Sequence, residues 1–440
     1  MTSIATIADS VLSVFTDVAE RAARLTGCVQ RYRAFSGATL VQTLVFGWLA
    51  SPSASLHQLT QMAAARGVVV SPQALDQRFT ARLAATLRQV LEAMLSHTVT
   101  SDPAAVPLFA RFRGIYLQDG TTVSLPAALA EEWQGCGGRP GEGTAALKLQ
   151  VGFDLLGGAL AGPVLQPGRA QDRSSPLRTM ELPPNSLRLH DSGFLVLDDL
   201  RTYAAKAVWT LCRLPVNITL AVAGGARVRQ GEVLLGRREH ALDLEVELGA
   251  TQPVAARLLA VRVPPQVAQE RRRKLRRQAK KQGQQVSRAR LAIADWTVLV
   301  TTAPRAVLSL EEGVILARIR WQIEMLFKLW KQDGLLDEWR SANPWRILCE
   351  VYAKLIGLVL QHWLLVAGCW QTVARSLVKG AQTVRAHALR LACSLQRRWA
   401  LVEALETLVR CLHSGCRMNT RRAQPNAFQL LLQPAWEPLT

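Results

Sequence analysis

Apolar residues recur at every third or fourth position through the first quarter of the chain and again through its last third. This spacing is typical of amphipathic helices, so we expect helices over residues 1–105 and from residue 310 to the C-terminus. Between these regions the pattern changes to short alternating runs that end at glycine or proline, as strands do. The hydrophobic pattern therefore predicts a mixed α/β protein with helices at both ends.

The expected strands fall into two groups that separate near residue 214. A helix over 195–205 interrupts the first group. The first group covers 115–119, 122–125, 147–156, 159–165, 187–190 and 208–212, and the second covers 228–235, 242–248, 258–263 and 294–300. We therefore expect a β-rich segment over 214–304.

One part of the N-terminal region predicts a helix-turn-helix-like arrangement. A short amphipathic helix over 55–66 ends at Gly67, and a second helix begins with Ser71 as N-cap and Pro72 at its first position. The second helix is expected to carry Gln77, Arg78, Arg82 and Arg88. Either the pair contacts DNA, or it is a packing hairpin in an all-helical domain.

Charge and composition narrow the class of protein. The chain has 440 residues, 49% of them hydrophobic, which predicts two to four domains with ordinary packed cores. Its net charge of +20 should attract a polyanion, with nucleic acid the first candidate and an anionic membrane the second. The apolar stretch 355–368 is too short to span a bilayer and predicts a buried helix. Scattered cysteines and the absence of a secretory signal predict a cytoplasmic protein.

Two aspartates stand out in the first group of strands. Asp119 and Asp191 each follow an apolar strand and are each followed closely by glycine. A strand end holds a side chain rigidly, so the two carboxylates would share a site if their strands are neighbours. For either residue alone, ordinary turn formation is the simpler explanation.

The helix expected over 316–332 is charged on one side. At 100° per residue, five positions fall within an arc of about 80°, opposite the apolar side chains. These positions are Ala317, Arg320, Glu324, Lys328 and Lys331. A solvated face with an Arg320–Glu324 ion pair would explain them. A carboxylate flanked by cations is also what phosphoryl transfer on DNA requires.

Carboxylates suit the metal chemistry of that reaction. Asp and Glu bind Mg²⁺ or Mn²⁺, and two such ions, ~3.5 to 4 Å apart, activate a water or a 3′-hydroxyl and stabilise the leaving oxygen. Arg and Lys side chains one turn away hold the neighbouring phosphates. We therefore expect a site with two divalent ions.

Three blocks of sequence carry a family resemblance. They are Leu117-Gln-Asp119-Gly-Thr, His190-Asp191-Ser-Gly-Phe194 and Arg318-Ile-Arg320-Trp-Gln-Ile-Glu324-Met-Leu-Phe-Lys328-Leu-Trp-Lys331. Their order and spacing resemble the catalytic blocks of the IS-four family of bacterial insertion-sequence transposases, over about residues 70–430. The resemblance implies an RNase H-like core with a DDE triad, interrupted by a β-rich insertion. It implies that Asp119, Asp191 and Glu324 are the catalytic, metal-binding triad.

The resemblance also assigns DNA contacts. Arg320 and Lys331 match the Arg and Lys of the family's Tyr-Arg-Glu-Lys signature, which contact phosphates near the cleavage site, and Lys328 lies beside them. The tyrosine position is Ala317, so one contact is either lost or supplied by a neighbour such as Trp321. Trp296 occupies the place where hairpin-forming members stack a tryptophan on a flipped base. Its alternating neighbours fit a core position equally well.

The densest positive charge lies within residues 270–281. Eight side chains contribute to it: Arg271, Arg272, Arg273, Lys274, Arg276, Arg277, Lys280 and Lys281. The run predicts a segment that contacts DNA phosphates with a strong salt dependence, and a solvated helix is the alternative.

These observations predict five segments. A helical DNA-binding domain over 1–105 precedes an RNase H-like core over 106–213 and 305–370, which a β-rich insertion over 214–304 interrupts, and 371–440 form a helical C-terminal region. The resemblance implies a protein that binds terminal inverted repeats, nicks the ends and performs strand transfer on double-stranded DNA. We expect a homodimer or larger synaptic complex, because two element ends must be held together, and no membrane. The alternatives are an inactive DNA-binding relative and an RNase H-like nuclease that cuts without joining.

Overall fold

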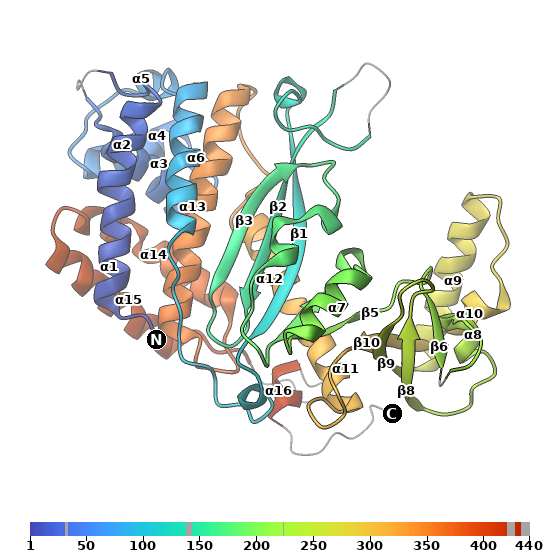
Figure 1. The fold of residues 1–440 in the computed structure, drawn as a ribbon. Helices are drawn as coiled ribbons and strands as arrows, with labels where there is room; N and C mark the ends of the chain where they lie inside the picture. The colour runs from blue at the N-terminus through green and yellow to red at the C-terminus, as the bar shows by residue number, and fades with distance from the viewer. Residues whose placement is uncertain (31–33, 138–142, 223, 420–426, 433–440) are drawn as a thin grey trace. The chain divides into compact units, whose positions relative to one another are not determined.

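The computed structural model describes residues 1–30, 34–137, 143–222, 224–419 and 427–432. Its chain divides into two compact units that interleave along the sequence. Unit 1 holds Met1–Ala105, Gly120–Ala170 and Gln322–Thr420, and unit 2 holds Val106–Asp119, Gln171–Trp321 and Arg421–Thr440. Figure 1 labels the elements of both units. The predicted mixed α/β class, with many helices and a large sheet, is confirmed.

Unit 1 is mainly helical, and its helices come from both ends of the chain. They are α1 (Ile4–Ser13), α2 (Ala19–Leu25), α3 (Gly37–Ala50), α4 (Leu56–Ala65), α5 (Pro72–Asp76), α6 (Ala81–Leu95), α13 (Pro344–Cys369), α14 (Leu377–Ser394) and α15 (Arg398–Gly415), with a π-helical turn η1 (Val14–Val18) between α1 and α2. Helix α13 packs against α3, α6, α14 and α15. By length and composition α13 could cross a membrane, but 94% of its apolar window is buried inside the protein, as predicted for a core helix.

The predicted helix-turn-helix differs in its second half. Ser71 caps α5 as expected, Ser55 also caps α4, and Gly67 follows α4 with a positive φ of 80°. Helix α5 is only five residues long, however, because Thr80 accepts a hydrogen bond from the Leu83 amide and starts α6. The expected second helix is therefore two helices, with Arg82 and Arg88 on α6.

Unit 1 also holds two whole strands and part of a third. Strand β2 (Ala145–Asp154) pairs with β3 (Leu160–Pro167), with a bulge between Gln150 and Gly152. The order is β3-β2-β1, where β1 (Ile115–Leu125) contributes its later residues to this unit. The 3-10 turn η3 (Ala127–Leu129) belongs to unit 1, whereas η2 (Phe109–Arg111), η4 (Asp172–Ser174), η5 (Pro176–Thr179) and η6 (Ser192–Phe194) belong to unit 2.

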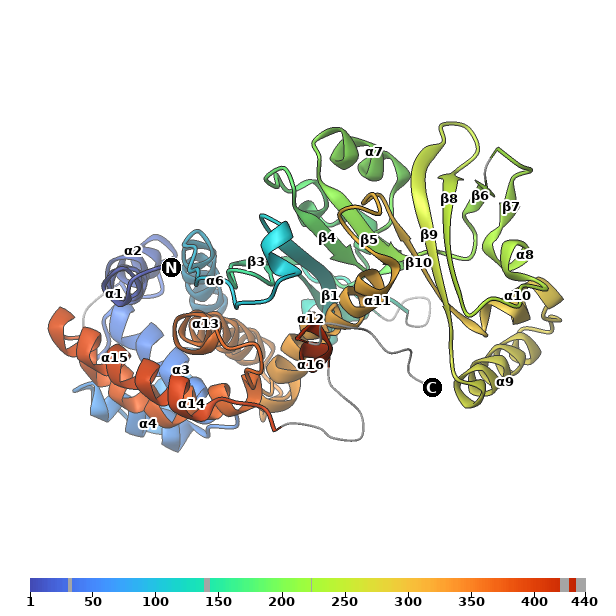
Figure 2. The same ribbon diagram turned by 90° about the horizontal axis from the view of Figure 1, so that it is seen from below.

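Unit 2 is built around strands in the order β1-β4-β5-β10-β9-β8-β6-β7. They are β4 (Leu187–His190), β5 (Trp209–Arg213), β6 (Thr219–Val222), β7 (Val228–Arg229), β8 (Ala241–Leu248), β9 (Val254–Arg262) and β10 (Trp296–Thr301), with the first residues of β1. The pairings β1–β4 and β4–β5 are parallel, and those from β5 to β7 are antiparallel (Figure 2).

Helices pack on both faces of β5 in unit 2. Leu200 of α7 (Leu197–Ala205) shares a core cluster with Cys212, whereas Gly313 of α11 (Leu310–Ile319) faces Leu211. Successive strand residues point to opposite faces, so α7 and α11 cover opposite sides of the strand. The remaining helices of this unit are α8 (Gln230–Leu234), α9 (Pro265–Lys281), α10 (Arg288–Ile293) and α16 (Ala427–Leu431).

Two other sequence predictions need correction. The strand expected over 228–235 is short, because after Arg229 the chain turns into α8, where Gly231 packs closely against the Ala289 carbonyl of α10. The helix expected over 316–332 is interrupted at Arg320 and continues as α12 (Trp321–Lys328) and a π-helical turn η7 (Leu329–Asp333). The predicted domain boundaries stay a prediction, since a compact unit can hold more than one domain. Residues 420–426 and 433–440 of the predicted C-terminal region lie outside the described residues.

Candidate active site

Asp119 and Asp191 lie at neighbouring positions in unit 2. Strands β1 and β4 are parallel partners, and their last paired residues are Gln118 and His190. Asp119 is the next residue of β1 and Asp191 directly follows β4, and paired strands are about 4.8 Å apart. The two carboxylates therefore start from adjacent backbone positions, which is what the hypothesis of a shared site requires.

The surroundings of Asp119 differ from the sequence prediction. Strand β1 continues through Asp119 and Gly120 to Leu125, so the turn expected after Asp119 is absent. A β-carbon on Gly120 would lie 3.0 Å from the Gln150 side-chain oxygen, so the glycine permits a close approach rather than a turn. Pairing with β4 nevertheless stops at Gln118, and Asp119 lies just beyond it.

Asp191 follows β4 as predicted and precedes the 3-10 turn η6. Its side chain does not cap that turn, so turn formation does not account for the carboxylate. Sequence reasoning missed Asp172, whose carboxylate lies 3.2 Å from where a β-carbon on Gly193 would be. A close contact between two distant loop segments has no local sequence signal that would have revealed it.

His190 supports the backbone at Asp191. Its Nδ1 is 2.9 Å from the Asp191 carbonyl oxygen, and because a carbonyl can only accept, Nδ1 carries the proton. The ring is 2% exposed, and this burial lowers the pKa of His190 to about 3. The imidazole is therefore neutral at physiological pH.

A buried arginine joins β1 to β4 just before the two aspartates. Arg188 donates to the Gln118 side-chain oxygen at 3.3 Å and to the Arg178 carbonyl at 3.2 Å. Its guanidinium also lies 4.0 Å from the centre of the Tyr203 ring. These contacts hold the residue that precedes Asp119 in place.

Arg320 has a partner that the sequence did not predict. Its Nη1 is 3.4 Å from Oδ2 of Asp119, and both side chains are mostly buried, at 16% and 20% exposure. The helix before it is fixed at its start, where Ser309 and Glu312 form a capping box and Arg111 pairs with Glu312 at 2.9 Å. Arg320 therefore lies beside one of the predicted metal ligands.

Glu324, Lys328 and Lys331 belong to unit 1. Helix α12 buries Ile323, Leu326 and Phe327, and leaves Glu324 half-buried and Lys328 exposed. Lys331 donates to the Thr122 carbonyl of β1 at 2.7 Å and lies 3.7 Å from Asp337. Because the chain passes from unit 2 to unit 1 after Trp321, the convergence of Glu324 with the two aspartates stays a prediction.

The chemistry of the donors agrees with a hard divalent ion. Within the described ranges no group of three or more His, Cys, Asp or Glu side chains forms a metal site. Mg²⁺ is usually held by one or two carboxylates together with water and substrate phosphates. Asp119 and Asp191, which start from adjacent backbone positions, supply carboxylates of the kind that such an ion prefers.

Trp296 lies in the hydrophobic core of unit 2. It is 2% exposed, shares a cluster with Val298 and Val300, and has the Arg262 guanidinium 4.5 Å from its ring centre. This burial agrees with the second interpretation of Trp296 given above, a residue of the hydrophobic core. Stacking on a base would require the ring to be uncovered.

All eight residues of the basic run lie on helix α9. Arg271 and Arg272 pack against the start of β10, and the other six are exposed. Those six are Arg273, Lys274, Arg276, Arg277, Lys280 and Lys281.

Comparisons with known proteins agree with the geometry. A family model described as "Transposase DDE domain" matches residues 110–360. The chain is 26% identical over 364 residues to the transposase for insertion sequence element IS231B of Bacillus thuringiensis subsp. berliner, covering 78% of this chain and 75% of that protein. It is 25% identical over 448 residues to the transposase for IS231F of Bacillus thuringiensis subsp. israelensis, covering 94% and 91%.

A solved structure gives a weaker likeness. The cryo-EM structure of a piggyBac transposase synaptic complex with hairpin DNA aligns over 97% of this chain and 80% of that chain, with 11% identity and a TM-score of 0.39. This likeness is too weak to establish a shared fold.

Proposed function

Because this chain belongs to the family of transposase DDE domains and is a DNA transposase with polynucleotidyl transferase and endonuclease activity, we propose that it cleaves and joins the ends of an insertion sequence. It binds the terminal inverted repeats and nicks them to expose a 3′-hydroxyl. That hydroxyl then attacks a phosphodiester of the target DNA, so a new phosphodiester joins the element end to the target while the target strand's own 3′-oxygen leaves. The observation that carries the proposal is the neighbouring placement of Asp119 and Asp191 at the end of the β1–β4 pairing.

The proposed catalytic residues are Asp119, Asp191 and Glu324, in an RNase H-like core interrupted by a β-rich insertion. Their carboxylates would hold two Mg²⁺ or Mn²⁺ ions, which supply charge stabilisation at the reacting phosphate. Arg320 keeps positive charge beside Asp119, and the neutral His190 holds the Asp191 backbone. These two residues position the carboxylates before any ion binds.

The proposed phosphate contacts near the cleavage site are Arg320, Lys328 and Lys331. Ala317 offers no hydroxyl at the family's tyrosine position, whereas Trp321 is 55% exposed and available to replace that contact. The protein acts on double-stranded DNA in the cytoplasm as a homodimer or a larger synaptic complex, because two element ends must be held together.

Three substitutions test the proposal in the full-length protein. Asp119→Asn, Asp191→Asn and Glu324→Gln should each reduce Mg²⁺-dependent cleavage and joining by more than about 100-fold. Loss of a residue that only supports a metal ligand typically reduces activity by about 10- to 100-fold, so a larger loss indicates a metal ligand itself. The substrate is a duplex with the matched inverted ends that flank the gene. End binding should survive, because the phosphate contacts remain.

Asp198→Asn is the matched control, because this exposed carboxylate on α7 pairs only with Arg201 in the described part of the chain. Its activity should stay near that of the unchanged protein. Strand transfer by the Glu324→Gln protein would refute the triad. Cleavage without joining would favour a nuclease, and end binding without cleavage by the unchanged protein would favour an inactive relative.

A further inference from the structure

Helix α9 divides its charges between two faces. One face packs onto unit 2: Ala268 is buried, Arg271 donates to the Trp296 carbonyl at 2.8 Å, and Arg272 pairs with Asp295 at 2.5 Å. At 100° per residue these positions, with half-buried Leu275 and Ala279, fall within about 100° of arc. Two of the eight cations therefore anchor the helix rather than face a ligand.

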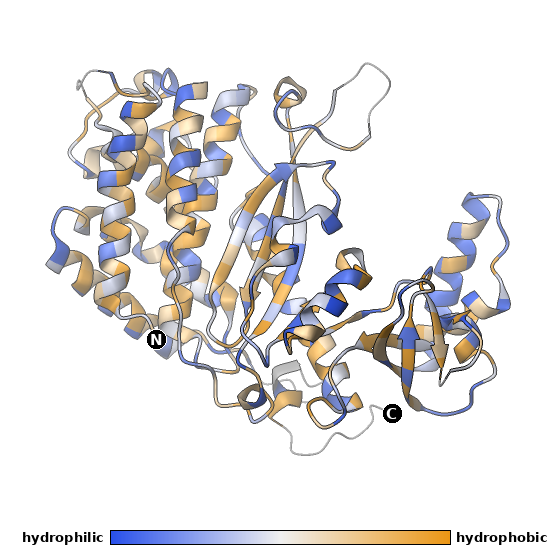
Figure 3. Cartoon of the chain, in the orientation of Figure 1, coloured by the Kyte–Doolittle hydropathy of each residue, from blue (hydrophilic) through white to orange (hydrophobic). Residues whose placement is uncertain are grey.

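The other six cations form what we call the α9 stripe. They are Arg273, Lys274, Arg276, Arg277, Lys280 and Lys281, all exposed, and they fall within about 160° of arc on the opposite side of the helix. Lys274 pairs with Glu270 at 2.8 Å, while within the described chain Arg276, Arg277, Lys280 and Lys281 form no ion pair. Figure 3 shows α9 mostly in the hydrophilic colour.

The stripe has the dimensions and charge to follow a nucleic-acid backbone. Residues 264–294 contain ten basic side chains and one acidic side chain, so they carry nine of the chain's twenty net positive charges. The 17 residues of α9 extend over roughly 26 Å, along which duplex DNA presents a charge every ~1.7 Å of its axis. Unneutralised cations at this density repel one another, and a polyanion relieves that repulsion.

The composition of the stripe indicates contact with phosphates rather than bases. Residues 265–293 contain no aromatic side chain that would stack on an unpaired base. An anionic membrane fits less well, because a membrane-binding helix needs an apolar face, and the less polar face of α9 is packed against unit 2. Among the described residues of α9, Val267 is the large hydrophobic side chain that is exposed, at 38%.

We propose that the α9 stripe is a sequence-independent binding site for the phosphate backbone of duplex DNA, additional to the carboxylate site. Its place in transposition rests on the proposed function, but the binding itself does not. A transposase must hold DNA whose sequence it does not read, either the target or the DNA that flanks the element ends. The stripe would hold one of these two duplexes.

The test measures binding of the full-length protein to a 30-base-pair duplex of random sequence between 50 and 300 mM salt. The variant changes Arg273, Arg276, Arg277, Lys280 and Lys281 to Gln. Each cation that meets a phosphate contributes about 0.9 to the slope of log K against log salt, so the slope should become shallower by up to ~4.5. A control that changes the three arginines to lysine keeps the charge and should keep the slope.

A matched pair on the same helix sharpens the test. Arg277→Gln should make the slope of log K against log salt shallower by about 0.9, the contribution of one phosphate contact. Lys274→Gln should change the slope less, because Lys274 is already paired with Glu270. An unchanged slope in the fivefold variant would overturn the proposal. Binding to phosphatidylserine vesicles that depends on the stripe, without any change for the duplex, would overturn it in favour of a membrane.

Two further substrates separate the possible duplexes. Loss of joining from pre-cleaved ends would assign the stripe to target DNA, and weaker binding only of ends that retain flanking DNA would assign it to the flank. The Asp119→Asn protein should keep the full salt slope while losing cleavage. The experiments therefore distinguish failure of the proposed catalytic triad, seen in cleavage, from failure of the proposed α9 stripe, seen in the salt slope.

Discussion

At the scale of single residues, burial holds two histidines in the neutral form. His190 has a pKa of about 3 and His362 a pKa of about 4, in both cases because the ring is removed from water. Each ring nitrogen that faces a backbone carbonyl donates to it, at Asp191 for His190 and at Gly158, 2.8 Å away, for His362. Both rings therefore donate to backbone carbonyls in their neutral forms.

Acid should destabilise the protein through these residues. An unfolded histidine titrates near 6.5, so the unfolded state takes up protons first as the pH falls, and stability is lost between about 6.5 and the folded pKa. For His362 this loss should be on the order of 2 kcal/mol between pH 7 and pH 5. Urea unfolding at both pH values should show a smaller loss for His362→Gln; an identical loss would contradict this account.

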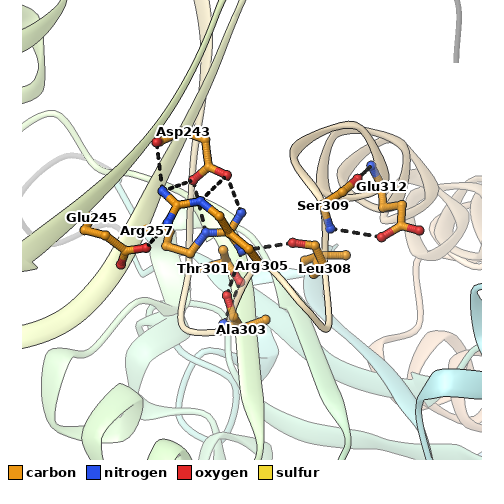
Figure 4. A network of polar contacts seen from close by, with 9 residues as sticks. All are labelled: Asp243, Glu245, Arg257, Thr301, Ala303, Arg305, Leu308, Ser309 and Glu312. Atoms are coloured by element: carbon orange, nitrogen blue, oxygen red, sulfur yellow. Dashed lines mark hydrogen bonds and ion pairs between the residues drawn. The ribbon is translucent and has the colours of Figure 1, made fainter.

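At the scale of elements, one ionic network ties three segments of unit 2 together (Figure 4). Arg257 on β9 donates to both carboxylate oxygens of Asp243 on β8, at 3.0 and 2.6 Å, and to the carbonyls of Ala303 and Leu308, each at 2.9 Å. Arg305 joins the same carboxylate at 3.1 Å. Burial alone would raise the pKa of Asp243, but the hydrogen bonds from both arginines outweigh it and lower that pKa. The network fixes the turn that leads into α11, the helix that ends just before Arg320.

Removing the buried arginine should cost far more than removing the exposed one. Arg257 is 3% exposed, and Arg257→Met would leave two carbonyls without their donor and Asp243 short of a partner, at a cost of about 3 to 5 kcal/mol. Arg305 is 52% exposed, so Arg305→Met should cost less than about 1 kcal/mol. Chemical unfolding of the two variants measures this difference. Equal losses in the free energy of unfolding would show that the network does not hold the turn.

At the scale of the whole molecule, the two units interleave in sequence yet each has its own buried polar anchor. In unit 1, Lys354 on α13 is buried, pairs with Glu350 at 2.7 Å and donates to the carbonyls of Leu335 and Glu338. In unit 2 the corresponding anchor is Arg257. Each anchor should therefore act mainly on its own unit.

Hydrogen exchange tests this independence. In the Lys354→Met protein, Glu350 loses its partner in a buried site, so amides of α13 and of the segment after α12 should exchange at least about tenfold faster. Strands β8 and β9 should keep their protection, and Arg257→Met should show the reverse pattern. Equal loss of protection in both units after either substitution would contradict independent cores.

The local sequence by itself determined the type and approximate place of several elements. The cap at Ser71, the strand before Asp191 and the buried helix α13 were all predicted, because caps and hydrophobic periodicity depend on residues within a turn or two. The three sequence blocks also indicated the family, which the match over residues 110–360 bears out. The roles of Asp119, Asp191 and Glu324 stay predictions that the substitutions above address.

Only the tertiary structure decided what surrounds these elements. Gly120 continues a strand and lets Gln150 come close to it, Arg320 pairs with Asp119 from two hundred residues away, and Trp296 is buried in the core of unit 2. The eight cations of α9 likewise separate into anchors and an exposed stripe only when the helix packs on unit 2. The physical reason is that pairing and burial depend on partners distant in sequence, which local periodicity does not specify.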